Sequence, residues 1–86
     1  MLKEIRYEYN KKENEIRFIL NTKFYLLEAI LLAASDFTCD FWVLVDGNPS
    51  SQILVCIKPK NNEKIDEKIL ILEFINHVIA GIKELM

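Results

Sequence analysis

Polar and apolar residues alternate near the start of the chain with the period of two that half-buried strands show. The alternation covers residues 5–9 and 16–20, and the polar run NKKEN at 10–14 separates the two stretches. Two alternating stretches that lie so close together predict an antiparallel hairpin.

The register of this hairpin follows from a turn centred on positions 12–13. Tyr7 then lies opposite Phe18 on the apolar face, and a slip of one residue would turn these rings into water. The same register places Glu8 opposite Arg17, and an opposite-charge pair of this kind contributes about 0.2–1 kcal/mol.

The most apolar stretch, Thr22–Phe37, has apolar residues at steps of three and four, which predicts a helix. Asn21 or Thr22 is the expected N-cap residue. The helix is apolar over so much of its circumference that we expect cover on more than one side, at the centre of the molecule. It is shorter than the roughly 20 apolar residues that cross a bilayer.

A second hairpin is predicted from strands at 41–45 and 52–58, with the turn DGNPSS between them. Both faces of this hairpin are apolar, which is typical of strands that are covered on both sides. One face consists of Phe41, Val43, Val45, Ile53, Val55 and Ile57, and the other of Trp42, Leu44, Leu54 and Cys56.

The last part of the chain is predicted to be one helix that starts after Asn61 or Asn62 as its cap and runs to Met86. Gly81 is expected to weaken it by about 1 kcal/mol relative to Ala. The expected buried stripe is Ile65, Ile69, Leu72, Ile75 or Asn76, Ile79 and Ile82, widened by Phe74, Val78 and Leu85.

Residues 1–86 are therefore expected to form a single α+β domain with the element order ββαββα. The expected architecture is a two-layer sandwich, in which both helices pack on one face of a four-stranded antiparallel sheet. The alternative is one helix on each face. The pattern leaves the order of the strands open.

Composition and charge narrow the function classes. Hydrophobic residues make up 51% of the chain, which excludes a disordered chain, and the net charge is −2. The charges form neither a basic stripe nor a polybasic patch, so we expect no nucleic-acid and no membrane partner. The first ten residues lack an apolar signal core, which predicts a cytoplasmic protein.

Residue patterns for catalysis are scarce. Cys39 and Cys56 are expected to be reduced thiols, although a disulfide between them is the alternative. His77, with Glu73 one helical turn before it, is the polar pair that a small enzyme would use. Zinc usually takes three protein ligands, and the spacing of the aspartates matches no calcium loop. We therefore predict no catalytic, cofactor-binding or metal-binding residues.

The predicted binding surface is the second apolar face of the sheet, because residues for a third layer of the same chain are lacking. Large apolar patches on small domains usually mark protein contacts, and Trp is favoured as an anchor. The candidate interface residues are Trp42, Leu44, Leu54 and Cys56.

Three segments together resemble the small His-Xaa-Ser system protein D family: EAILLAASDF at 28–37, ILVCIKPK at 53–60 and LEFINHVI at 72–79. The matching positions are Glu28, Ala29, Ala33, Ala34, Phe37, Lys58, Pro59, Lys60, Glu73, Phe74 and Asn76. Where the family tends to continue with Glu, this chain has His77. The resemblance implies a partner of radical-SAM peptide-modifying enzymes and carries over no catalytic residue.

These observations predict a non-catalytic accessory protein that binds another protein or a peptide, in a radical-SAM peptide-maturation system as the resemblance implies. The alternative is a stand-alone homodimer whose sheets pack face to face. A small enzyme built on His77 is the third hypothesis.

Overall fold

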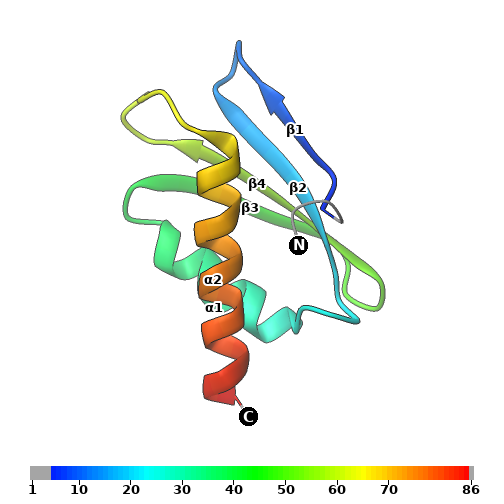
Figure 1. Cartoon of the computed structure of the whole chain (residues 1–86). Coiled ribbons are helices and arrows are strands. Elements are labelled where there is room, and N and C mark those ends of the chain that lie inside the picture. The colour runs from blue at the N-terminus through cyan, green and yellow to red at the C-terminus, as the bar shows by residue number, and fades with distance from the viewer. Residues whose placement is uncertain (1–4, 86) are drawn as a thin grey trace.

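The structure, a computed structural model, describes residues 5–85. Its elements are β1 (Tyr7–Asn10), β2 (Glu15–Asn21), α1 (Leu27–Phe37), β3 (Phe41–Asn48), β4 (Gln52–Pro59) and α2 (Glu67–Leu85). The four strands form one antiparallel sheet in the order β1-β2-β4-β3. The two hairpins therefore meet through β2 and β4, and β1 and β3 are the two edges (Figure 1).

The predicted α+β class and the two layers are confirmed. Both helices lie on the same face of the sheet, α2 beside the first hairpin and α1 beside the second (Figure 1). The alternative of one helix on each face is wrong. Neither α1 nor α2 combines the length and the apolar character that a membrane span needs.

The predicted register of the first hairpin is confirmed, since Tyr7 is paired with Phe18 and Glu8 with Arg17. The expected ion pair is not the one that forms. The Arg17 Nε donates instead to Glu15 Oε1 at 2.8 Å, on the same face of its own strand. Side chains two residues apart in a strand point to the same face, so this local pair competes with the cross-strand one.

The second hairpin is longer than predicted. The pairing continues past Val45 through Asp46, Gly47 and Asn48, so the turn shrinks to residues 49–51. Gly47 adopts a φ of 120°, and a Cβ at this position would lie 2.6 Å from the Gln52 carbonyl oxygen. Glycine is therefore required at position 47. In the sequence analysis, Gly47 counted only as a residue of the predicted turn.

The core lies between the sheet and the helices. Its floor is the inner face of the two central strands, formed by Ile16, Phe18, Leu20, Ile53, Val55 and Ile57, all of them buried. Above it, Phe74 of α2 packs edge-on against Phe18 and also contacts Phe37 of α1, with ring centroids 5.3 and 5.2 Å apart. Phe37 in turn contacts Phe41 of β3. This chain of rings joins both helices to both hairpins.

Helix α1 begins at Leu27 and not at Thr22, because the residues before it are held by the sheet. The Thr22 N–H donates to the Ser51 carbonyl, which extends the pairing of β2 with β4, and the Asn21 side chain accepts from Lys23 in a turn. The N-cap, Leu26, makes no side-chain capping bond. The helix contacts α2 and the sheet but is not wrapped on all sides.

Helix α2 also begins later than predicted. Asp66 is the capping residue, and its Oδ1 accepts from the N–H groups of Lys68 and Ile69. The buried stripe is Leu70, Ile71, Phe74, Ile75, Val78 and Gly81, whereas Ile69 and Leu72 of the predicted stripe are exposed. The prediction placed the buried face too far round the helix. Met86 lies outside the described residues.

Gly81 belongs to the observed buried face. A Cβ at Gly81 would lie 3.3 Å from the Cβ of Ala29, so the two helices approach each other closely here. Small residues let helix backbones come together. Gly81 therefore faces the core, and its loss of helix propensity is offset by the close contact with α1.

We predict that Gly81→Leu lowers the free energy of unfolding by about 1–3 kcal/mol, because the added side chain forces the helices apart. The control is Ala80→Leu, on the exposed side of the same turn, for which we expect a change within about 0.5 kcal/mol. Urea unfolding followed by circular dichroism measures both. Equal stability of the two variants would contradict this account of the helix crossing.

Candidate functional site

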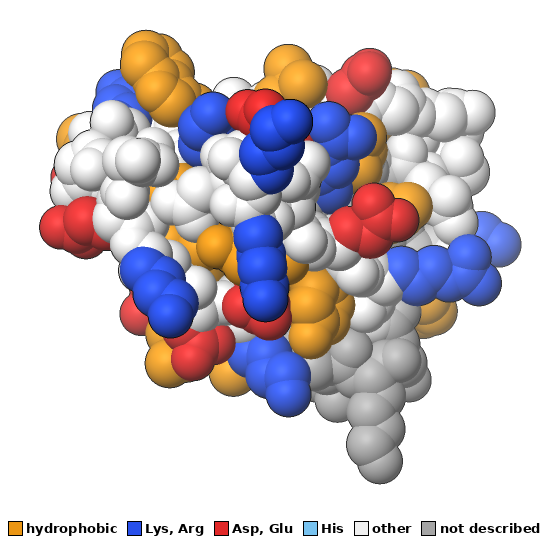
Figure 2. Space-filling model, turned by 90° about the horizontal axis from the view of Figure 1, so that it is seen from above, with side chains coloured by type: hydrophobic (Ala, Val, Ile, Leu, Met, Phe, Trp, Pro, Cys, Tyr) orange, Lys and Arg blue, Asp and Glu red, His pale blue; other side chains and the backbone are white. Residues whose placement is uncertain are grey.

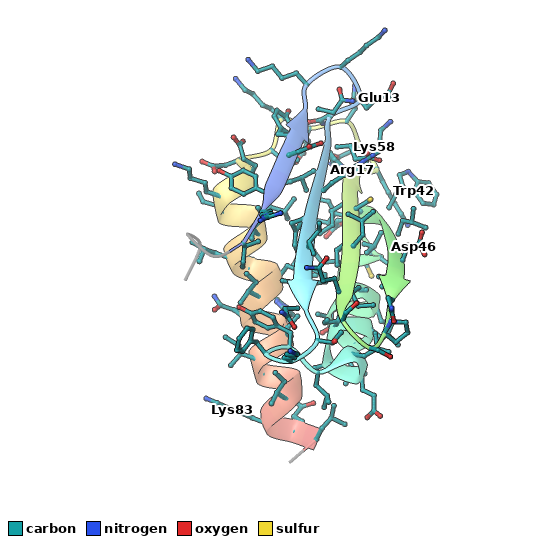
Figure 3. The ribbon with its side chains drawn as sticks, turned by 90° about the vertical axis from the view of Figure 1, so that its right-hand side faces the viewer. Glu13, Arg17, Trp42, Asp46, Lys58 and Lys83 are labelled. Carbon is teal, nitrogen blue, oxygen red and sulfur yellow. The ribbon has the colours of Figure 1, made fainter. Side chains whose placement is uncertain are left out.

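The candidate surface is the outer face of the sheet, which we define as the face turned away from the helices. Within residues 5–85 no helix covers it. The strand registers place these side chains on it: Glu8 from β1, Glu15, Arg17 and Ile19 from β2, Leu54, Cys56 and Lys58 from β4, and Trp42, Leu44 and Asp46 from β3. Figure 3 looks onto this face, with Trp42 and Asp46 at its β3 edge.

All four residues of the predicted interface lie on this outer face. Trp42 and Leu44 are 63% and 61% exposed, which is high for apolar side chains of this size. Leu54 is half-buried on β4, diagonal to Leu44. Three of the four predicted residues are thus accessible to a partner.

Cys56 is the exception, because only 6% of it is exposed. Its Cα partners are Leu44 on one side and Arg17 on the other, and these longer side chains cover the thiol. It therefore forms the floor of the patch and not a contact point. The sequence analysis did not predict the burial of Cys56, because it left the strand order open and so did not place Arg17 on the strand next to β4.

Ile19 was also missed as a member of this surface. It is the cross-strand partner of Leu54 and is partly exposed. The alternation in the first hairpin does place Ile19 on the outer face. Only the pairing of β2 with β4 brings it beside the apolar residues of the second hairpin.

Charges of both signs surround the apolar patch. Lys58 Nζ lies 3.4 Å from Glu13 Oε2, and Lys60 Nζ lies 4.7 Å from the centre of the Trp42 ring. A cation over an aromatic face is attracted by about 0.5–1 kcal/mol at an exposed site. Figure 2 shows the end of the molecule that carries the β1–β2 turn, where basic and acidic side chains are interspersed.

The environment of Cys56 also sets its reactivity. Burial raises the pKa of the Cys56 thiol, and the Glu15 carboxylate raises it further, whereas the Arg17 guanidinium lowers it. A raised pKa leaves less of the nucleophilic thiolate near neutral pH. Cys39, in contrast, is exposed, and both cysteines are free thiols.

His77 does not form the side-chain pair with Glu73 that a small enzyme would need. Its Nδ1 lies 2.8 Å from the Glu73 backbone carbonyl oxygen, and its ring packs edge-on against Phe37. These contacts fix the exposed imidazole on the surface of α2. Among the described residues, His, Cys, Asp and Glu side chains form no group of three that could hold a metal ion.

A depression of about 550 Å³ lies where the end of β2 approaches α2. Its described lining is mostly apolar and consists of Ile5, Ile19, Phe24, Tyr25 and Ile79 together with Arg6, Asn21 and Gln52. This lining contributes neither a carboxylate nor an imidazole, so it offers no acid–base pair.

No protein-family model matches the chain, and comparisons with curated proteins and with solved structures give no significant match. The surface itself is therefore the basis for a functional proposal.

We predict that one thiol of the folded protein reacts rapidly with Ellman's reagent at pH 8 and that the second reacts only on unfolding. The rapid thiol is Cys39, which is exposed, and the slow one is Cys56, which is buried and has a raised pKa. Cys39→Ser should remove the rapid phase. Two thiols of similar rate in the folded protein would show that the outer face does not cover Cys56.

Proposed function

We propose that this chain is a non-catalytic accessory protein that binds another protein through the outer face of its sheet. The observation that supports the proposal is the exposure of Trp42 and Leu44, with Leu54 diagonal to Leu44, on a face that neither helix covers. The resemblance of three segments to the His-Xaa-Ser system protein D family supports a radical-SAM peptide-modifying enzyme as the partner. A cytoplasmic location fits such a partner.

The patch has the composition of a protein interface. Binding hot spots are enriched in Trp and lie in a desolvated centre, and more polar residues form the rim around them. Here Leu44 and Leu54 lie diagonally across β3 and β4, and Trp42 follows Leu44 along the outer side of β3. Lys58 and Asp46, the cross-strand partners of Trp42 and Leu54, border these apolar side chains. A partner that covers this face would also desolvate the contact between Lys60 and Trp42 and strengthen it.

Charge placement favours such a partner over a second copy packed face to face. Arg17 lies beside Cys56 near the middle of the outer face, and its head is exposed. Two stacked copies would bury both Arg17–Glu15 ion pairs, and the cost of desolvating a buried ion pair can exceed its Coulombic gain. A different protein can cover the apolar side chains and leave this ion pair at the solvent-exposed rim.

We predict that Leu54→Lys weakens binding of the radical-SAM enzyme encoded in the same genome at least tenfold, or about 1.4 kcal/mol. A lysine ammonium at the centre of the patch must be desolvated on binding. Trp42 is the sole tryptophan of the chain, so its fluorescence reports binding at this face. The affinity is obtained by titrating the chain with a tryptophan-free form of the purified enzyme. Alternatively, a fluorescent label is attached to the chain and excited selectively while unmodified enzyme is added.

The control is Leu72→Lys, which places the same charge at an exposed apolar position of α2 on the helix side. It should bind like the unmodified chain. Failure of the enzyme to bind the unmodified chain would exclude it as the partner. Equal affinity of both variants would exclude the outer face as the binding surface.

A further inference from the structure

The β3 edge of the sheet carries an unprotected apolar strand. β3 is eight residues long, and its first five residues, FWVLV, include no charge, glycine or proline. Soluble proteins usually protect sheet edges by short strands, charges, prolines or bulges. The opposite edge follows that rule, because β1 has four residues and carries Glu8.

The backbone of β3 is ready to accept another strand. The Lys60 N–H donates to the Asp40 carbonyl, just before β3 begins. Hydrogen-bonded positions alternate along an antiparallel pair, so the even-numbered residues of β3 direct their N–H and C=O groups to β4. Phe41, Val43 and Val45 therefore direct theirs to the free edge. Their side chains lie on the inner face and are half-buried.

Helix α1 extends the apolar character of this edge into the second layer. Ala29 of α1 faces Gly81 of α2. Leu31 is about 200° further round the helix, at about 100° per residue, and so lies on the flank away from α2. Helix α1 packs against β3, and Leu31 is 49% exposed.

From these features we infer that β3 pairs antiparallel with β3 of a second copy about a twofold axis at Leu44, which joins the two sheets into one. Each Leu44 then lies opposite its counterpart, and Val43 lies opposite Val45 of the second copy. The exposed flanks of the two α1 helices, with Leu31, meet beneath the new pair of strands.

Several registers would leave the outer faces of the two copies on the same side of the joined sheet. The charges favour the register with the axis at Leu44. With the axis at Leu44, Asp46 lies opposite Trp42 of the second copy, next to the Lys60 ammonium that stands over that ring. With the axis at Val43, Asp46 would lie opposite Asp40, and like charges opposite each other are destabilising. With the axis at Val45, Leu44 would lie opposite Asp46.

This pairing does not depend on the proposed function. It leaves the outer face uncovered and brings the Leu44 side chains of the two copies together at the axis, with one Trp42 on either side of them. A partner protein would therefore meet a patch twice as large as that of a single chain.

The first test is the solution mass by light scattering over a dilution series. We expect twice the chain mass for the unmodified protein and the mass of one chain for Val43→Pro, because proline removes an N–H that faces the free edge. Tyr7→Pro is the matched control: Tyr7 is also half-buried, and its N–H faces away from β2 at the opposite edge. This variant should stay dimeric, and circular dichroism checks that both variants fold.

The second test locates the axis without altering the backbone. In a Cys39→Ser, Cys56→Ala background, Leu44→Cys should form an intermolecular disulfide on mild oxidation, since directly opposed residues have Cα atoms about 4.5–5.5 Å apart. Asp46→Cys should not, because its two copies would be about 13 Å apart, four residues at about 3.3 Å each.

Several results would overturn the inference: a monomer at every concentration, a dimer that Val43→Pro leaves intact, or equal cross-linking at both positions. Leu54→Lys separates it from the proposed function, because Leu54 lies on the outer face away from the edge. That variant should remain dimeric while it loses the partner protein. A monomeric Leu54→Lys variant that is folded would place the second copy on the outer face instead.

Discussion

The antiparallel pairing of β2 with β4 is the contact on which the rest of the structure depends. It joins hairpins that are far apart in sequence, and it aligns two rows of buried side chains, from Ile16 to Leu20 and from Ile53 to Ile57. The helices have a continuous apolar floor only because these rows are adjacent. The same pairing extends to Thr22 and Ser51, which delays the start of α1. Strand order and helix length are thus consequences of one interaction.

This pairing also decides which strand is left at the edge. β3 is among the most apolar strands of the chain, and strands of this type usually lie in the middle of a sheet. Here β4 occupies the middle, so Trp42 and Leu44 face solvent on the outer side and the β3 backbone is open on one flank. Trp42 and Leu44 are among the most exposed large apolar side chains of the described residues, and both lie on this strand. The exposed outer side chains of β3 and its open backbone therefore both follow from the position of β3 at the edge of the sheet.

Local patterns predicted most of the fold, and tertiary contacts account for the rest. Strict alternation in the first hairpin specified its register, and alternation in the second placed Trp42, Leu44 and Leu54 on one face. The burial of Cys56 and the contribution of Ile19 depend on the neighbour of β4, which no local pattern specifies. The buried face of α2 was predicted too far round the helix because apolar residues occupy most of its circumference, so hydropathy did not separate the buried Leu70 and Ile71 from the exposed Ile69 and Leu72. Only its contact with Ala29 shows that Gly81 belongs to the core.

The inequality of the two sheet edges has a consequence for assembly. When β3 pairs with β3 of a second copy about a twofold axis, the free β3 edges of both copies are occupied at once. The two outer edges of the joined sheet are then the β1 strands. That strand is short, carries Glu8 and leads into Lys11 and Lys12, which makes it a poor template for a third chain. Growth by edge addition would thus end at a closed pair and not continue into a fibre. The short, charged β1 would thus limit the strand pairing that the long, apolar β3 makes possible to two copies.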